Sequence, residues 1–176
     1  MNSSVHRAIG RRRNHLGSFG MTAVIGLSSL GGLVQQCAPA PAPAPVIVQV
    51  GGVENTVVTT ANQHRASSGA SALVVDSRLT SAAQGHADDM ANRRVMTHTG
   101  SNRSNAGQRI AVYGYGASTW AENVAAGQNT PEQVVAAWMN SAGHRQNILN
   151  GSLVNIGVAA AKGTNGVTYW AMVLAA

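Results

Sequence analysis

Two strand patterns at the end of the chain constrain the fold most. Residues 154–160 and 167–174 are rich in Val, Ile, aromatic and small apolar side chains, a composition typical of β-strands. Between them, Gly163-Thr164-Asn165-Gly166 has the composition of a hairpin loop. The sequence therefore predicts that the chain ends in an antiparallel β-hairpin.

Helical patterns precede this hairpin. Apolar side chains recur at helical spacing in residues 54–65, and Asp76-Ser77 forms an N-cap pair for a second helix that ends near Arg93. Thr130-Pro131-Glu132 predicts the start of a third helix, which ends near Asn140. Helices followed by an antiparallel hairpin imply an α+β layered domain and exclude a doubly wound sheet.

Three shorter segments lie between these patterns. Each is predicted from its local composition: a helical turn near residues 106–112, a short strand or bend at 121–127, and a tight turn with about one helical turn at 143–149.

The first 37 residues resemble an export signal. Arg7, Arg11, Arg12 and Arg13 make the beginning basic, and residues 19–34 are uncharged and mostly apolar or small. A basic region followed by a short apolar region is typical of a signal peptide, and this one is too short for a typical membrane span. An uncleaved membrane anchor is the alternative. Arg12-Arg13 also has a faint likeness to a twin-arginine signal.

The way in which this segment is processed stays open. Ala38-Pro39-Ala40 has the small-x-small shape of a cleavage site, but Pro41 follows it. Cys37 would be the lipidated residue of a lipoprotein-type signal, although Gln36 stands where a small residue is usual; otherwise it is a free thiol. We assign residues 1–37 to the signal and 38–50, rich in Ala and Pro, to an extended spacer. Residues 51–176 form the globular domain.

The net charge of the whole chain does not describe the charge of the globular domain. The formal net charge is +6, but the four N-terminal arginines account for most of it. From Cys37 onward, eight Lys or Arg residues face six acidic residues, with few aromatic side chains among them. No basic stripe remains in the domain, so we expect no nucleic-acid partner.

The order of motifs in the domain resembles the CAP superfamily, which comprises the SCP-like, cysteine-rich secretory, antigen 5 and pathogenesis-related 1 proteins, and in particular its bacterial members. The matching pieces run in family order over residues 55–176: Asn62, Arg65 and Gly69; Leu79, Ala83, His86 and Met90; Thr97-His98; Gly114-Tyr115; 121–124; 138–149; 156–158; and Tyr169-Trp170. This resemblance implies a three-layer α-β-α sandwich with an antiparallel sheet and a shallow central cleft.

The resemblance also implies a polar site made of His98, Glu122 and His144. In the family, two His and two Glu line the cleft and can bind a divalent cation, often zinc. Here His98 and His144 would be the metal ligands, and Ser141 stands where longer members have the second Glu, as a hydrogen-bonding substitute, a nucleophile or only a turn residue. Asn123 is expected beside the cleft or bound to loop backbone, and His86 in the core.

Three functions compete on these grounds. The first is a binding module, secreted or attached to the bacterial cell envelope, that holds a metal, a lipid such as a sterol, or a cell-wall component. The second is a metal-assisted hydrolase that acts on peptides or peptidoglycan through the candidate catalytic residues His98, Glu122 and His144. The third is a structural or host-interaction protein with a vestigial cleft. We expect a monomer that contacts membranes only through its N-terminal segment.

Overall fold

The structure is a computed structural model, and it describes residues 51–176. The signal and spacer assigned to residues 1–50 lie outside the described residues. Within residues 51–176, the helices and strands follow one another in this order: α1 (Gly52–Ser67), β1 (Val74–Val75), α2 (Ser77–Arg93), α3 (Ala106–Val112), β2 (Trp120–Ala126), α4 (Pro131–Asn140), α5 (Ala142–Leu149), β3 (Asn155–Lys162) and β4 (Thr168–Ala175).

The strands form one sheet in the order β1-β3-β4-β2. Strands β3 and β4 make the predicted C-terminal hairpin, and β2 pairs antiparallel with β4 over its whole length. The expected antiparallel sheet is confirmed, and β1 adds to it one short parallel pair with β3. A strand of two residues carries too short a pattern to be predicted from the sequence.

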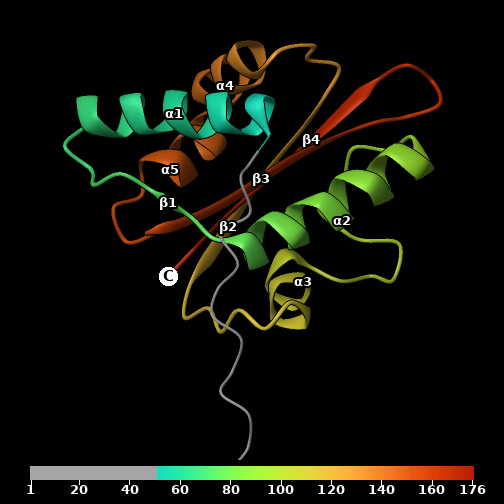
Figure 1. The fold of residues 1–176 in the computed structure, drawn as a ribbon, viewed down its shortest axis with the longest axis horizontal. Helices are drawn as coiled ribbons and strands as arrows, with labels where there is room; N and C mark the ends of the chain where they lie inside the picture. Colours follow the sequence, from blue (N-terminus) through green and yellow to red (C-terminus); the bar gives the residue numbers. More distant parts are fainter. Residues whose placement is uncertain (1–50) are drawn as a thin grey trace, which may run out of the picture. The chain divides into compact units, whose positions relative to one another are not determined.

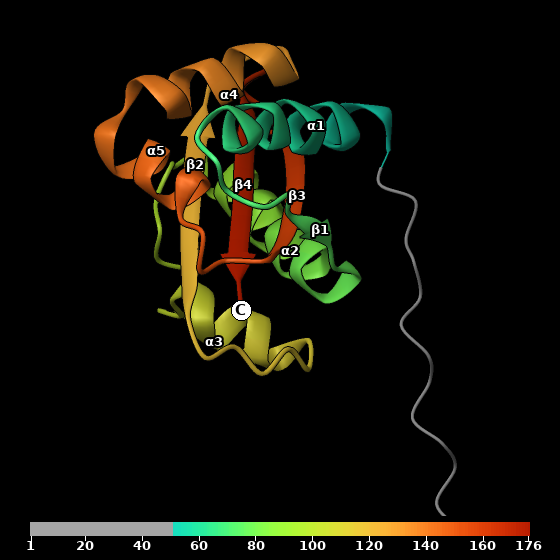
Figure 2. The same cartoon turned by 90° about the vertical axis from the view of Figure 1, so that its left-hand side faces the viewer.

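Helices cover both faces of the sheet, as the α-β-α prediction requires. Figures 1 and 2 show α1, α4 and α5 on one side and α2 and α3 on the other. Alternate residues of each strand point to opposite faces, so the sheet contributes to two separate cores. The α1-side core includes Val135, Trp138 and Met172, and the α2-side core includes Leu79 and Val173.

Local side chains begin three of the helices. The Asp76 side chain accepts a hydrogen bond from the backbone N–H of Arg78, and Thr130 accepts one from Gln133, which confirms both predicted N-caps. Helix α3 begins with a reciprocal capping box between Asn105 and Gln108. These caps satisfy N–H groups that have no partner within the helix.

Two segments are more regular than their sequence indicated. Residues 121–127 were predicted as a strand or a bend, and most of them belong to the seven-residue strand β2. The turn expected at 143–149 is the eight-residue helix α5. Both lie beside the candidate site, and both are held by tertiary contacts rather than by strong local patterns.

Arg65 attaches the end of α5 to α1. Its side chain is fully buried and donates hydrogen bonds to the backbone carbonyls of Ser71, Ile148, Asn150 and Leu153 at 2.6–2.9 Å. A buried guanidinium is tolerated because its N–H groups meet these carbonyl acceptors. These hydrogen bonds of Arg65 fix the segment between α5 and β3. They therefore also fix the position of α5, which carries His144.

Candidate functional site

The candidate site is built around β2, which lies at one edge of the sheet. Because side chains alternate along a strand, Glu122 and Val124 face the α2 side whereas Asn123 and Ala125 face the α4–α5 side. Neighbouring residues of one strand thus reach opposite layers of the sandwich. Because of this alternation, β2 contacts the loop that carries His98 on one face and helix α5 on the other.

Glu122 is the centre of a buried charge cluster. Its side chain is 3% exposed, and Oε1 lies 2.9 Å from Nδ1 of His98. The guanidinium of Arg109 pairs with Oε2. A third group, Nε2 of His86, lies 3.9 Å from Oε1. A buried carboxylate needs such partners, since burial without them is costly.

Arg109 is a site residue that the sequence reasoning missed. It belongs to α3, and besides Glu122 it donates hydrogen bonds to the carbonyls of His98 and Ser104 at 3.2 and 2.8 Å. It therefore fixes both the carboxylate and the loop that carries His98. The available signal was charge balance, because Glu122 in an apolar strand pattern requires a cation from another element.

The three histidines near this cluster have different electrostatic environments. The hydrogen bond to Glu122 raises the pKa of His98 above its usual value, against a smaller opposing effect of burial. Burial lowers the pKa of His86 and of His144, and in His144 the positive charge of His98 adds to that effect. Near neutral pH, His98 is the most readily protonated of the three.

His144 approaches from the other layer of the sandwich. It lies in the first turn of α5, and its backbone carbonyl accepts a hydrogen bond from Nδ2 of Asn123 at 3.0 Å. Asn147 donates to Oδ1 of Asn123 at 2.9 Å and to the carbonyl of Glu122 at 3.3 Å. These amides hold α5 against the free edge of β2. Asn123 itself is fully buried, so it supports the site from beneath.

No hydrogen bond within residues 51–176 joins His144 directly to Glu122. His98 is half-exposed, and the hydrogen bonds described for that range leave its Nε2 free. Ser141 is both the C-cap residue of α4 and the N-cap residue of α5. Its hydroxyl makes no hydrogen bond to either histidine within residues 51–176. The structure therefore brings together His98 and Glu122, with His144 near them and Ser141 beside His144.

A cavity of about 300 Å³ opens beside His144. It lies along the edge of β2, and its lining is mostly apolar: Met96, Val124, Ala125, Ala126, Gln128, Ala137, Trp138, Ser141 and His144. Met96 is 54% exposed, which leaves an apolar side chain at the rim of the cavity. A ligand here would contact apolar groups and His144 together.

The donor groups at this site limit how a metal could bind. Both oxygens of Glu122 are engaged by His98 and Arg109, so neither is free to bind a metal. Across residues 51–176 no three His, Cys, Asp or Glu side chains are grouped as a metal site. His86 is fully buried, so the ring nitrogens open to a ligand are Nε2 of His98 and those of His144.

The layered fold, with helices on both faces of one sheet, agrees with the predicted resemblance to the CAP superfamily. A family model described as the cysteine-rich secretory protein family matches residues 58–174. The chain therefore belongs to this family, and the predicted resemblance is confirmed.

A curated relative is bacterial. The chain is 38% identical over 109 residues to the uncharacterized protein YkwD of Bacillus subtilis (strain 168), and the match covers 62% of this chain. It spans only 42% of the length of that relative.

Solved structures share the fold at low sequence identity. An outer surface protein of Borrelia burgdorferi matches over 73% of this chain and 95% of its own, with a TM-score of 0.66 and 23% identity. An extracellular SCP-domain protein of Bacillus anthracis str. Ames matches over 70% and 40%, with a TM-score of 0.63 and 23% identity. NaASP2, solved with Zn²⁺, matches over 75% and 83%, with a TM-score of 0.55 and 14% identity. Among the described helices of this chain, none has the length and apolar character needed to cross a membrane.

Proposed function

We propose that this CAP domain is a binding module whose cleft, at the edge of β2, presents two imidazoles beside an apolar cavity. One observation carries the proposal: Glu122 holds His98 by Nδ1 and leaves Nε2 free, while His144 approaches from α5. A ring fixed through one nitrogen presents the other in a defined direction. Nε2 of His98 and the ring of His144 would thus be available to bind a ligand.

The same arrangement supports a divalent cation as part of the ligand. His98 and His144 would hold the ion, with Glu122 as the carboxylate that orients His98. Zinc commonly takes nitrogen ligands, and two of its positions would remain for water or for groups of a bound molecule. The neighbour NaASP2 was solved with Zn²⁺. When bound, the cation would supply an attachment point for carboxylate, phosphate or hydroxyl groups.

The lining of the cavity suggests the rest of the ligand. Met96, Ala137 and Trp138 offer apolar contact within about 300 Å³, next to His144. A molecule with a polar head and an apolar portion fits this pairing, as a lipid, a sterol or a wall-derived fragment would. Each would place its polar group at the imidazoles.

The hydrolase alternative has less support. Glu122 is neutralised by Arg109, and the described residues provide no hydrogen bond between Ser141 and a histidine that would activate its hydroxyl. His98 has a raised pKa, which makes it a weaker candidate for a base that must be unprotonated near neutral pH.

We also propose that the domain works outside the cytoplasm. Structural neighbours are described as an outer surface protein and an extracellular protein. The basic and apolar beginning of the sequence, predicted as an export signal, agrees with this placement. The monomeric state stays a prediction.

Zinc titration tests the cation-binding part of the proposal. The full-length protein is stripped with a chelator, and its thermal unfolding is followed with increasing ZnCl₂. A ligand at one hundred times its Kd stabilises the folded state by about 2.7 kcal/mol, so we expect a rise in Tm in the wild type and none in His98→Ala or His144→Ala. Ser141→Ala is the matched control and should keep the rise. A wild-type Tm that does not respond to zinc would refute cation binding.

Fatty-acid binding in solution tests the lipid-binding part separately. The wild type and Ala137→Glu, which places a charge in the cavity lining, are each titrated with a fluorescent fatty acid below its critical micelle concentration. We expect saturable binding by the wild type and clearly weaker binding by the variant. Equal binding by both proteins would rule out the cavity as the lipid site.

A further inference from the structure

An open groove lies between α3 and the beginning of β2. It has a volume of about 430 Å³, within the roughly 300–1,000 Å³ of small-molecule sites. Its lining comes from α3 with its N-cap, from the segment that joins α3 to β2, and from the first residue of β2: Asn105, Gly107, Gln108, Ala111, Tyr115, Gly116, Ala117 and Trp120. None of these residues belongs to the Glu122 cluster or lines the cavity beside His144. The groove is therefore separate from the cleft described above.

Trp120 is an exposed aromatic side chain at this groove. It is 43% exposed, whereas the other two tryptophans of the chain are buried in the core. A Cβ at Gly107 would come within 2.4 Å of Nε1 and 2.8 Å of Cε2 of Trp120, so the indole lies directly against the backbone of α3. An aromatic ring that is held in place before binding loses little conformational entropy when a ligand contacts it.

Two side-chain amides in the lining have free hydrogen-bond donors. Oε1 of Gln108 accepts a hydrogen bond from the backbone N–H of Asn105 at 3.0 Å, and Oδ1 of Asn105 accepts one from the backbone N–H of Gln108 at 2.9 Å. Because a backbone N–H can only donate, this pairing fixes which atom of each amide is the oxygen. The two NH₂ groups have no acceptor among the hydrogen bonds of residues 51–176, and both residues are exposed. A ligand in the groove therefore meets donors that can bind its acceptor groups.

The lining of the groove is uncharged. Among its residues, all of which lie in the described range, none is Lys, Arg, His, Asp or Glu. Arg78 lies over the ring of Tyr115, 4.7 Å from its centre, but its charge is paired with Asp76 at 2.6 Å. The hydroxyl of Tyr115 donates to Oδ1 of Asn155 at 2.8 Å and is thus already engaged. A ligand that suits this groove is neutral, with an apolar face for the indole and an acceptor for the amides.

We propose that the groove binds an N-acetylated sugar, such as one unit of an N-acetylglucosamine chain. The C–H face of the sugar ring lies on the exposed part of Trp120, and the acetamido carbonyl accepts hydrogen bonds from the NH₂ groups of Asn105 and Gln108. An acetamido group is neutral and carries a carbonyl acceptor, which is what these donors lack. Because the three side chains are exposed, the sugar reaches them without a rearrangement of the fold.

A proline-rich peptide is the competing occupant, since its backbone carbonyls are also acceptors. Such peptides dock into grooves that are lined by aromatic side chains. In this groove Tyr115 is only 8% exposed, which leaves Trp120 as the exposed aromatic residue of the lining. A single platform matches one sugar ring better than an extended peptide.

NMR titration of the ¹⁵N-labelled full-length protein tests this site. The indole N–H signal of Trp120 and the side-chain NH₂ signals of Asn105 and Gln108 are followed while N-acetylchitotriose is added. Cellotriose has the same rings and linkage with a hydroxyl in place of each acetamido group, so it isolates the contribution of that group. We expect saturable shifts with N-acetylchitotriose and about three- to tenfold weaker binding of cellotriose.

Two results of this titration would overturn the proposal. The first is the absence of a saturable shift with N-acetylchitotriose, or binding of cellotriose that is equally tight or tighter. The second concerns the competing occupant, for which an eight-residue peptide of alternating Ala and Pro is the probe. Tighter binding of this peptide than of N-acetylchitotriose would assign the groove to a polypeptide.

Conservative variants separate recognition from folding. Asn105→Asp and Gln108→Glu keep the oxygen atoms that cap α3, but they replace the NH₂ donors by acceptors. The double variant should therefore keep a Tm close to that of the wild type and bind N-acetylchitotriose at least about tenfold more weakly. Gln63→Glu, at an exposed position of α1, is the control for the added negative charge and should bind like the wild type. A folded double variant that binds as tightly as the wild type would refute the proposal.

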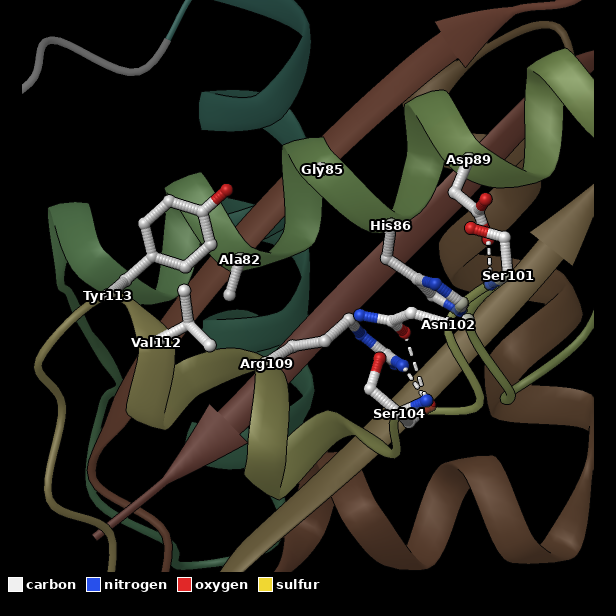
Figure 3. A pocket seen from close by; sticks show the side chains of 11 residues that line it. Ala82, Gly85, His86, Asp89, Ser101, Asn102, Ser104, Arg109, Val112 and Tyr113 are labelled. Carbon is white, nitrogen blue, oxygen red and sulfur yellow. Dashed lines mark hydrogen bonds between the residues drawn. The ribbon is translucent and has the colours of Figure 1, made fainter.

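The role of Trp120 has its own matched pair of variants. Trp120→Ala should weaken binding more than about tenfold, as the loss of a central aromatic contact does in other interfaces. Tyr113 is exposed to a similar fraction, 44%, but it lies beside Ala82 and Gly85 of α2 in another pocket (Figure 3). Tyr113→Ala should therefore leave binding unchanged. Full binding by Trp120→Ala, or its loss in Tyr113→Ala, would place the sugar elsewhere.

One further variant separates this site from the cleft. His144→Ala removes an imidazole that does not line the groove, so N-acetylchitotriose should still bind where zinc no longer raises the Tm. Loss of sugar binding in His144→Ala would contradict a separate site. The sugar and zinc experiments can thus fail independently.

Discussion

The buried side chain of Glu122 requires partners from other parts of the chain. A carboxylate with a 3% exposed side chain in a strand that is otherwise mostly apolar is stable only with cationic or N–H partners. His98 and Arg109 provide them from two other segments. The pair positions His98, and the same guanidinium holds the loop on which His98 lies.

The protonation of the histidines can be measured directly. In a ¹H–¹³C NMR titration we expect His98 to titrate above 6.5 and His86 and His144 below it, in the directions set by Glu122 and by burial. Glu122→Gln should move the His98 midpoint down, because the negative charge is lost. Glu132→Gln changes an exposed acid on α4 and is the control, so it should leave the midpoint in place. A wild-type His98 midpoint below 6.5 would contradict the pairing.

The raised pKa of His98 also predicts how the stability of the fold changes with pH. A histidine whose folded pKa is raised stabilises the fold fully below its unfolded pKa, and this contribution disappears as the pH rises through the folded value. The stability advantage of wild type over His98→Gln, measured by urea unfolding at several pH values, should therefore shrink as the pH rises above about 6.5. The effect is small, since His98 is half-exposed and solvent screens the pair. An advantage that grows with pH would contradict the assigned direction.

The sequence and the structure contributed differently at the residue scale. His98, Glu122, Ser141 and His144 were selected from motifs because each has a recognisable place in the family order. Arg109 was not, because its role exists only through contacts with Glu122 and with two backbone carbonyls of the loop that precedes α3. Asn123 was expected beside the cleft or bound to loop backbone, and it supports α5 from beneath through the carbonyl of His144.

The packing of α2 on β3 depends on one glycine. A Cβ at Gly157 would lie 2.1 Å from the backbone carbonyl carbon of Leu79 and 2.2 Å from the backbone nitrogen of Thr80. The helix backbone therefore lies directly on the strand. The α2-side core can close only if this position has no side chain.

Substitution of this glycine should separate the two elements. We expect Gly157→Ala to destabilise the protein by about 3 kcal/mol or more, because backbone atoms cannot give way as flexible side chains do. Gly151→Ala is the control, since a Cβ there meets nothing within 4 Å. Urea unfolding measures both, and equal midpoints for wild type and Gly157→Ala would refute the close packing.

Helices with strong capping signals were predictable, whereas α5 and β2 were not predicted at full length. The N-cap side chains of Asp76 and Thr130 act within a few residues, so local sequence reveals them. Helix α5 begins at Ser141 without a side-chain cap. It is held instead by Arg65 and by the amides of Asn123 and Asn147, whose contacts join distant parts of the chain.

At the scale of the molecule, two cores share one sheet. Ile148 is fully buried in the α1-side core and Leu79 in the α2-side core. Strand β4 is buried on both faces and contributes to each core, with Met172 and Val173 on opposite sides. Loss of one core should therefore weaken the sheet that the other core needs.

This coupling predicts a single unfolding transition. We expect Leu79→Ala and Ile148→Ala each to cost about 2–5 kcal/mol and to shift the whole transition. Circular dichroism and tryptophan fluorescence should report the same midpoint in wild type and both variants. Midpoints that separate in either variant would show that the two layers unfold independently.

The sequence by itself determined the layered α+β class, the C-terminal hairpin, the capped helices and the family. These features depend on periodicity, caps and ordered motifs, which lie within short stretches of chain. Tertiary structure alone decided the parallel strand β1, the length of α5 and the role of Arg109. Each of these depends on groups far apart in the chain, whose hydrogen bonds and burial are defined only once the layers have packed.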